Sequence, residues 1–401
     1  MKRRLHHLGE KLIEGLITIS GTVTSLTVLL IVFYLFKEGL GIFSHTPVAE
    51  ESVLAVNRQN PVTELSANQV KEIFDQNITN WKDVGGPDAP IKLFQVDDIT
   101  DYYSEEQIGA NFEHLPQRLN EVVAKDPHIL AFFPDEYLAK DFTGKKLALE
   151  KINLGSFLGG KEWYPTIQPA VQMGVLSLIL GTLWVSLGAI IIALPLGLAT
   201  AIYLAEIANP KIRGILKPVI ELLAGIPSVV YGFFGLVVIV PMIQSVFGLP
   251  VGETALAGSI VLGIMALPTI ISVSEDAMRT TPRAMKEASL ALGANKWQTI
   301  YKVIIPYSIS GISTAAILGI GRAIGETMAV LMVTGNAAVI PSTFLEPVRT
   351  IPATIAAELG EAPQGGIHYQ SLFALGCILF LMTLAINLTV DFVSAKKKAN
   401  R

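Results

Sequence analysis

Long stretches without charged side chains alternate with polar segments along this chain. Five of them contain no Asp, Glu, Lys or Arg: residues 15–36, 222–251, 254–274, 303–321 and 369–390. A sixth, longer run covers residues 163–205. Because about 20 apolar residues in a helix cross the roughly 30 Å hydrocarbon core of a bilayer, each stretch is long enough to span a membrane. The alternative, buried helices of a large soluble protein, rarely provides so many uncharged residues in a row.

The pattern therefore predicts an all-α integral membrane protein with six transmembrane helices. We expect the spans at about residues 15–36, 174–205, 218–246, 254–275, 306–336 and 370–392. The basic residues before the first span are typical of a signal peptide, but its apolar stretch is too long and no small-residue cleavage motif follows Phe36. We expect residues 1–36 to form a tail and a retained anchor helix.

The basic residues between the predicted spans indicate the orientation. They gather before the first span, between the second and third, between the fourth and fifth, and after the last: Lys2, Arg3, Arg4, Lys11, Lys211, Arg213, Lys217, Arg279, Arg283, Lys286, Lys296, Lys302, Lys396, Lys397, Lys398 and Arg401. The two shorter connections on the opposite side contain one basic residue, Arg349. Since short cytoplasmic connections carry an excess of Lys and Arg, both termini are predicted to be cytoplasmic.

Residues 37–164, here called the insert, have the composition of a water-soluble α+β domain. Residues 52–57, 90–96, 129–133 and 146–152 resemble strands. Ser66 and Ser104 are N-cap residues that each open a helix-like stretch. With a cytoplasmic N-terminus and one span before it, the insert is predicted to be extracytoplasmic. The remaining residues, 165–401, then form a five-helix membrane core.

The composition excludes several classes of function. Only 16% of the 401 residues are charged and 51% are hydrophobic, whereas about a quarter are charged in soluble domains. The single Cys377 lies in the last apolar run, and the six His residues show no metal-ligand spacing. No Gly-x4-Gly-Lys-Ser/Thr loop, nucleophilic triad or aromatic-interleaved basic patch is present. We therefore expect no enzyme activity, no cofactor or metal, and no nucleic-acid partner.

The connection between the fourth and fifth spans, at about residues 276–305, carries the most specific motif. It reads Glu287-Ala288-Ser289-x3-Gly293 and ends at Pro306. It resembles the EAA loop, E-A-A-x3-G-x9-I-x-L-P, of bacterial ABC importer permeases, in which a helix, a turn and a second helix fit a groove on the ATPase subunit. Ala288 keeps the first helix narrow, Gly293 permits a left-handed turn, and Glu287 can meet a cationic partner. The alternative is an amphipathic surface loop.

A second motif lies within the fifth predicted span, where the sequence from Gly321 reads G-R-A-I-G-E-T-M-A-V. Arg322 and Glu326 are four residues apart, so on a continuous helix they share a face and can pair. A charge at mid-membrane costs on the order of 3 kcal/mol, and such residues usually face the protein interior or a pathway. We expect these two residues and Thr327 to line the path of an anion. A structural ion pair between packed helices is the alternative.

The third predicted span contains a break at Gly225-Ile226-Pro227-Ser228. The proline removes a backbone donor and kinks the helix. Within a membrane, such breaks are tolerated where the freed backbone is buried in protein or lines a cavity. A cavity lining and a packing kink with small-residue contacts are both consistent with the sequence.

Residues 163–395 as a whole resemble the phosphate-transport permeases of the PstC type, in the binding-protein-dependent transport permease family. The stretch L-K-P-V-I-E-L-L-A-G-I-P-S-V-V-Y-G-F-F-G from Leu216 and the G-R-A-I-G-E-T-M-A-V segment carry the resemblance. It implies the ABC importer permease fold in a bacterial plasma (inner) membrane. It also implies a second, PstA-like permease, two ATPase subunits, an extracytoplasmic phosphate-binding protein, and inward passage of phosphate, in which the family's Arg and Glu are implicated. A molybdate or sulfate permease, and a membrane-anchored phosphate sensor without transport, are the alternatives.

The insert departs from that family, whose members commonly have a short connection here. Residues 60–91, which include I-T-N-W-K-D-V-G-G-P-D-A-P-I, resemble part of a phosphate-binding receptor. Such receptors continue with an Arg and a Ser-Gly-Thr loop, whereas this chain continues Q-V-D-D-I-T-D from Gln95. Asp97, Asp98 and Asp101 would repel a phosphate dianion. We expect a receptor-like scaffold without the phosphate site, which either covers the outer mouth or docks a separate receptor.

Overall fold

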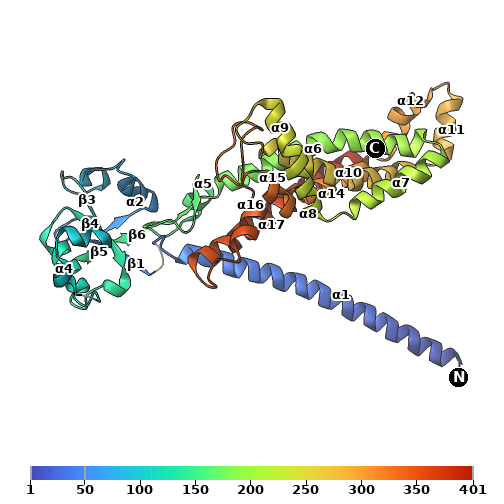
Figure 1. Cartoon of the computed structure of the whole chain (residues 1–401). Helices are drawn as coiled ribbons and strands as arrows, with labels where there is room; N and C mark the ends of the chain where they lie inside the picture. The colour runs from blue at the N-terminus through green and yellow to red at the C-terminus, as the bar shows by residue number, and fades with distance from the viewer. Residues whose placement is uncertain (1, 49–50, 110, 400–401) are drawn as a thin grey trace.

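The computed structural model describes residues 2–48, 51–109 and 111–399, and it contains three parts (Figure 1). Helix α1 (Lys2–Gly41) runs along one side, the strands of the insert lie at one end, and the helices from α6 onward form the membrane body. Helices α11 (Arg283–Ala291) and α12 (Lys296–Thr299) lie at the end of the body farthest from the insert (Figure 1). Helix α1 begins toward that same end.

Five helices among the described residues are long and apolar enough to cross a membrane: Ile13–Ser44, Leu176–Ile207, Ser228–Phe247, Ala255–Arg279 and Ile367–Thr389. A sixth span is present if Lys296–Tyr307 and Ile309–Gly325, which are bent by 71° relative to each other, count as one. The predicted six-helix membrane protein with an α+β segment after the first helix is therefore confirmed, with the fifth span bent.

Two predicted spans are not single helices. The expected span at 218–246 is divided into α7 (Pro210–Ala224) and a second piece formed by α8 (Ser228–Phe234), a π-helical turn and α9 (Val240–Phe247). The expected span at 306–336 is divided into α13 (Ile305–Tyr307), α14 (Ile309–Gly325) and α15 (Met328–Val333). Hydrophobic length marks where the chain can enter a membrane, but it does not show where a helix ends within that length.

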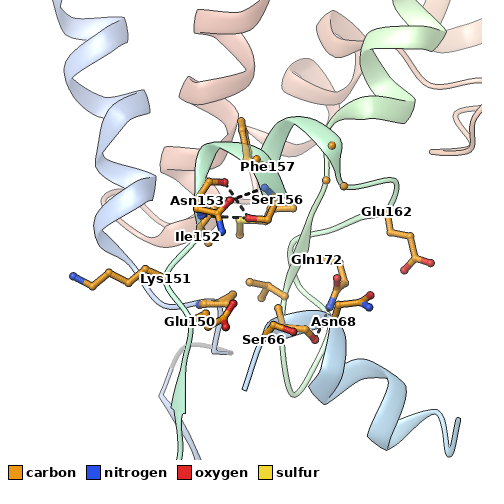
Figure 2. Close-up of a pocket in the computed structure, with 18 of the residues that line it drawn as sticks. Ser66, Asn68, Glu150, Lys151, Ile152, Asn153, Ser156, Phe157, Glu162 and Gln172 are labelled. Atoms are coloured by element: carbon orange, nitrogen blue, oxygen red, sulfur yellow. Dashed lines mark hydrogen bonds between the residues drawn. The ribbon is translucent and has the colours of Figure 1, made fainter. Parts of the chain in front are cut away.

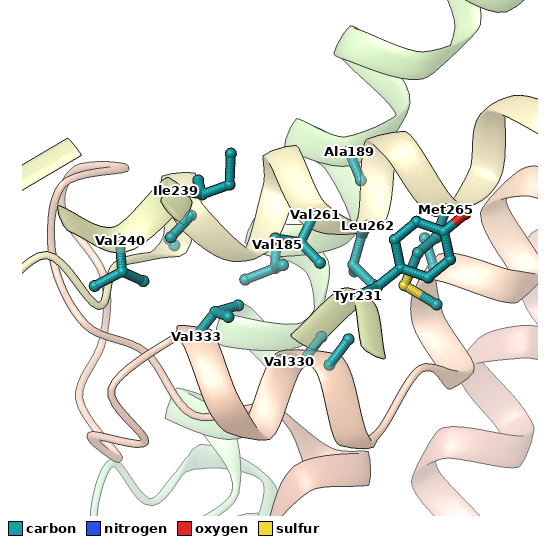
Figure 3. Packing of buried hydrophobic residues seen from close by; sticks show 14 of the residues in the cluster. Val185, Ala189, Tyr231, Ile239, Val240, Val261, Leu262, Met265, Val330 and Val333 are labelled. Carbon is teal, nitrogen blue, oxygen red and sulfur yellow. The ribbon is translucent and has the colours of Figure 1, made fainter. Parts of the chain in front are cut away.

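The core of the membrane body lies between α6 (Leu176–Ile202), α8, α10 (Ala255–Arg279) and α15. Buried side chains from these helices interlock there, as Figure 3 shows for Val185, Ala189, Tyr231, Val261, Leu262, Met265, Val330 and Val333. Helices α8 and α15 approach each other very closely: a Cβ added to Gly232 would lie only 2.9 Å from the Ala329 Cα. The break before α8 and the break before α15 are thus held against each other.

Helix α1 stands apart from the body along most of its length (Figure 1). Its apolar side chains are exposed: Ile17, Leu29 and Phe33 are each 67% exposed. Only its last turns contact α17 (Ile367–Ala399), for example through the edge-to-face rings of Tyr34 and Phe373. An apolar surface of this size must be covered by lipid or by another subunit.

The part of the insert farthest from the body, residues 52–149, is here called the distal lobe. Its sheet has the order β3 (Lys92–Gln95), β4 (Ile129–Pro134), β1 (Ser52–Val56) and β5 (Lys145–Lys146). Strands β3 and β4 are parallel, and β1 is antiparallel to its neighbours. The strands expected at 52–57, 90–96 and 129–133 are confirmed. The expected strand at 146–152 is replaced by the end of β5 and by the two-residue β6 (Ala148–Leu149), which pairs with β2 (Glu64–Leu65).

Successive side chains of β1 point to opposite faces of the sheet, and a different helix covers each face. Val53 and Ala55 pack with α4 (Leu115–Lys125), which the sequence analysis missed, and Leu54 and Val56 pack with α2 (Ala67–Phe74). Ser66 caps α2 with a full capping box, as predicted. Ser104 likewise opens α3 (Glu105–Ile108), a single short turn.

Residues 150–175 are here called the collar, and they join the distal lobe to the membrane body. They contain α5 (Leu154–Gly159) and the antiparallel pair β7 (Trp163–Tyr164) and β8 (Gln172–Met173). The collar shares one apolar core with the body, through Ile42, Phe157, Trp163, Val175, Leu178, Ile351, Leu372 and Leu375. Since these side chains are buried together, the collar is fixed to the body.

Candidate functional site

The loop between α10 and α14 has the predicted helix–turn–helix geometry. Glu287, Ala288 and Ser289 lie on α11, and Gly293 follows with φ +85°. Asn295 caps α12 through a capping box with Gln298. The hydroxyls of Ser289 and Thr299 lie 3.0 Å apart and join the two helices. The left-handed turn expected at Gly293 is therefore present, because only a residue without Cβ adopts this φ readily.

The surface of this loop is unusually apolar for a segment rich in polar residues. Leu292 is 89% exposed, Trp297 63% and Leu290 50%. Glu287 is exposed as well, and the structure gives it no ion-pair partner among the described residues. Lys286 anchors α11 to the body through Glu206, with 2.5 Å between Nζ and Oε1. Exposed apolar side chains on an anchored loop are typical of a protein-binding surface.

The break at Gly225, Pro227 and Ser228 is confirmed. Helix α7 ends at Ala224, Pro227 has ψ 142°, and α8 starts at Ser228. The Tyr231 hydroxyl donates a hydrogen bond to the Leu223 carbonyl, at 2.8 Å, and so satisfies an acceptor at the end of α7. The break is therefore stabilised by a side-chain hydrogen bond across it.

Arg322 and Glu326 are not paired on one helix face, and this prediction was wrong. Helix α14 ends at Gly325, and Glu326 is extended, with φ −73° and ψ 133°. The structure contains no ion pair between them among the described residues. A spacing of four residues implies a shared face only while the helix continues, and this helix stops one residue too early.

The residues around this second break point in different directions. Glu326 lines a small internal void together with Thr182 and Ser186 of α6 and Thr350. Its carboxylate accepts a long hydrogen bond from the Ala329 amide, at 3.4 Å. Thr327 lies instead in a shallow hollow with residues of α16 (Ile351–Glu358) and α17. Glu326 and Thr327, which are neighbours in sequence, therefore face two separate environments.

A buried ionic cluster that the sequence analysis missed ties α7 to α10. The Glu275 side chain is only 1% exposed, and its two carboxylate oxygens lie 2.7 Å from Arg213 and 3.0 Å from Lys217. Arg279 lies 3.8 Å away, and Asp276 also holds Lys217 at 2.9 Å. In the sequence, Arg213 and Lys217 served only as markers of orientation. The acidic pair Glu275-Asp276 directly after an uncharged run was the available signal.

A cavity of about 540 Å³ lies between the distal lobe and the collar (Figure 2). Its polar lining includes Ser66 and Asn68 at the start of α2, and Asn153 and Ser156, which cap each other at the start of α5. Two lysines and two glutamates also line it: Lys151, Lys161, Glu150 and Glu162. With equal numbers of each charge, this cavity has no net attraction for an anion.

The backbone amide of Gln95, the last residue of β3, is not free to bind an anion. The Gln95 amide donates to the carboxylate of Asp98, at 2.7 Å, and Asp97 and Asp101 are exposed beside it. The amide hydrogen is therefore already bound by a negative group of the chain itself. This arrangement is consistent with the predicted absence of a phosphate site in the insert.

The chain is similar to known proteins over both of its main parts. The model of the "Binding-protein-dependent transport system inner membrane component" family matches residues 193–398, and that of the "PBP superfamily domain" matches residues 37–126. A probable ABC transporter permease protein, YqgH, of Bacillus subtilis strain 168 is 42% identical over 242 residues, which cover 60% of this chain and 78% of the relative. The phosphate transport system permease protein PstC of Mesorhizobium japonicum is 39% identical over 264 residues, covering 61% and 79%.

Solved structures are similar at lower levels. The inward-facing MetNI methionine ABC transporter is 21% identical, with a TM-score of 0.42, over 56% of this chain and 94% of that one. An ABC-type phosphate transport receptor from Vibrio cholerae is 25% identical, with a TM-score of 0.20, over 27% of this chain and 50% of the receptor.

The spans, the anchored loop and the paired helix breaks define an integral membrane permease subunit of an ABC importer, which has no catalytic activity of its own. The chain belongs to the binding-protein-dependent transport system inner membrane component family. Membership in this family implies ATPase and binding-protein partners. The PBP-like segment at residues 37–126 lies within the insert.

Proposed function

We propose that this chain passes inorganic phosphate inward across a bacterial plasma membrane, as one of two permease subunits. The observation that carries the proposal is Arg322, which is half-buried on α14 inside the membrane body. No carboxylate among the described residues lies within ion-pair distance of it. A guanidinium left unpaired at this depth is costly, so an anion from outside this chain has reason to meet it there.

Phosphate is the anion that the sequence relatives suggest, since the permeases of M. japonicum and Xylella fastidiosa strain Temecula1 are named for phosphate transport. The paired breaks next to Arg322 supply small residues and freed backbone at the same depth. Arg322 also lies within electrostatic range of the Tyr231 hydroxyl on α8. Arg322, Glu326 and Thr327 together with Gly225, Pro227 and Ser228 are our proposed pathway residues.

Energy would enter through the loop of residues 283–299. Its exposed Leu292 and Trp297, with Glu287 beside them, form the surface that we assign to one of two ATPase subunits. Because this loop and the insert lie at opposite ends of the molecule (Figure 1), we place the loop and both termini in the cytoplasm. Residues 37–164 then face outward, where a phosphate-binding receptor docks, and a PstA-like permease completes the pathway.

Phosphate uptake by proteoliposomes that contain the full complex and the receptor tests this function. We expect ATP-dependent uptake of labelled phosphate that excess sulfate or molybdate does not reduce. Uptake of sulfate or molybdate instead would show that the substrate is a different oxyanion. Binding of the receptor without uptake of any oxyanion would indicate a sensor.

Arg322 is tested in the same system by comparing Arg322→Gln with Arg322→Lys. The Gln variant should assemble normally but lose at least tenfold in uptake per assembled complex, and the Lys variant, which keeps the positive charge, should retain more. Since Arg322 and Glu326 are not paired, adding Glu326→Gln to Arg322→Gln should not restore uptake. Recovery in that double variant would show that the two residues form a scaffold and would remove Arg322 from the pathway.

A further inference from the structure

Trp163 of the collar meets three side chains from residues 349–368 where the collar contacts the membrane body. The Glu358 carboxylate, at the end of α16, accepts a hydrogen bond from the Trp163 indole at 3.0 Å. Arg349 lies 2.9 Å from one of its oxygens and His368 2.9 Å from the other. Trp163, Arg349, Glu358 and His368 are here called the Glu358 network.

The Glu358 network is largely shielded from water. The side chain of Glu358 is 15% exposed and that of His368 is 11% exposed. Burial alone would raise the pKa of Glu358, but hydrogen bonds from His368 and Trp163 and the charge of Arg349 hold that pKa below its ordinary value. The carboxylate is therefore ionised at neutral pH, when its bonds to the other members of the network are strongest.

On one side, the network is connected to the distal lobe through the residue next to Trp163. The Glu162 carboxylate lies 3.2 Å from the Lys71 ammonium on α2, and the hydrogen bond that Lys71 donates to Glu162 helps to raise the pKa of Lys71. The Gln172 amide on β8 donates to the Ala67 carbonyl at 3.2 Å. The collar thus contacts the distal lobe at Glu162, just before β7, and the membrane body at Trp163, the first residue of β7.

On the other side, the network is connected to the second helix break. Arg349 precedes Thr350, the N-cap of α16, and the Ile351 amide donates to the Thr182 hydroxyl at 2.9 Å. Thr182 and Thr350 line the same internal void as Glu326. Helix α6 also packs tightly here, because a Cβ on Gly181 would lie 2.3 Å from the Arg349 carbonyl oxygen. A series of short contacts therefore links the collar to Thr182 and Thr350, which line the same gap as Glu326.

We propose that the Glu358 network transmits the position of the insert to the membrane segment at Glu326, so that the insert controls how the permease opens on its own side. Trp163, Arg349 and Glu358 are then positioning residues. The mechanical link stands on the contacts alone, whereas the effect on transport rests on the proposed function. An insert fixed in this way differs from a receptor domain on a flexible tether, which could move without affecting the spans.

Amide hydrogen exchange on the purified full complex tests the link without any substrate. Trp163→Phe keeps the ring but removes the donor to Glu358, and we expect exchange in α16 to rise at least tenfold. Trp184→Phe is the matched control, because the Trp184 indole nitrogen is buried without a hydrogen-bond partner among the described residues. Unchanged exchange in α16 after Trp163→Phe would overturn the link.

A second pair of variants covers the case in which Trp163→Phe fails to assemble. Glu358→Gln keeps the shape of the side chain and should raise exchange in α16 and around Thr350 by a similar factor. Glu361→Gln is its control, since Glu361 is exposed. The double variant Trp163→Phe/Glu358→Gln should be no worse than Glu358→Gln alone, because both changes remove the same contact. Fully additive effects would contradict a shared network.

Measurements of transport distinguish a coupling role of the Glu358 network from a purely structural role. We expect Trp163→Phe to lower the maximal uptake rate per assembled complex severalfold, with the phosphate concentration at half-maximal rate unchanged and ATP hydrolysis retained. Increased exchange with unchanged uptake would overturn control of opening by the insert. If the wild-type complex does not transport phosphate, the proposed function fails, and the exchange results still decide the link.

Discussion

Removing the buried carboxylate of Glu275 should loosen α7 without unfolding the membrane body. In Glu275→Gln, Arg213 and Lys217 lose their charged partner, at 2.7 and 3.0 Å in the wild type. Breaking a buried ion pair typically costs about 3–5 kcal/mol. Here the side chains of the two cations are 28% and 23% exposed, so that water partly replaces the carboxylate. We expect the local cost to be about 2–3 kcal/mol, below the fully buried range.

Hydrogen exchange of α7 amides measures this cost directly, because exchange reports the free energy of local opening. A loss of 2–3 kcal/mol corresponds to exchange that is roughly 30- to 150-fold faster. Asp276→Asn is the matched control: Asp276 also contacts Lys217, at 2.9 Å, but its side chain is 67% exposed. A surface pair contributes about 0–1 kcal/mol, so the control should change exchange less than about fivefold. Equal effects of the two variants, or none in Glu275→Gln, would refute this reasoning.

Three further outcomes are expected. Gly293→Val should abolish ATP-driven uptake while the chain still inserts, because a β-branched residue is excluded from φ +85°. Gly293→Asn should retain part of the activity. Normal uptake by the Val variant would remove the coupling assignment. The chain with Arg322→Gln, without its receptor, should show no saturable phosphate binding in titration calorimetry at micromolar phosphate, because Asp98 already occupies the Gln95 amide of the insert; micromolar binding by this variant would make the insert a tethered receptor. Since the pKa of Glu358 is depressed by the groups that face it (Arg349, His368 and Trp163), its stabilisation of α16 should be complete at neutral pH and lost as pH falls through that lowered pKa. The exchange difference between wild type and Glu358→Gln should accordingly shrink as the pH falls below the ordinary pKa range of a Glu carboxyl, and a difference that persists when the carboxyl is fully protonated would contradict the ionised network.

Much of the fold could be predicted from the sequence because its determinants are local. An apolar run either is or is not long enough to cross a bilayer, so the first, second, fourth and sixth spans were found at nearly their observed positions. Ser66 caps α2, Gly293 forms the left-handed turn and Pro227 breaks the helix for reasons that involve only neighbouring residues.

The sites required the tertiary structure, because burial and partners come from distant segments. Arg322 and Glu326 have the spacing of a helical pair. In the folded chain, however, α14 ends at Gly325, and this helix end separates the two side chains. Arg213 meets Glu275 across 62 residues, and Trp163 meets Glu358 across 195. Sequence by itself determined which residues are charged and which segments can enter a membrane. Only the folded chain decides which charges lose their water, and therefore which of them must pair within the chain and which remain for a ligand or another subunit.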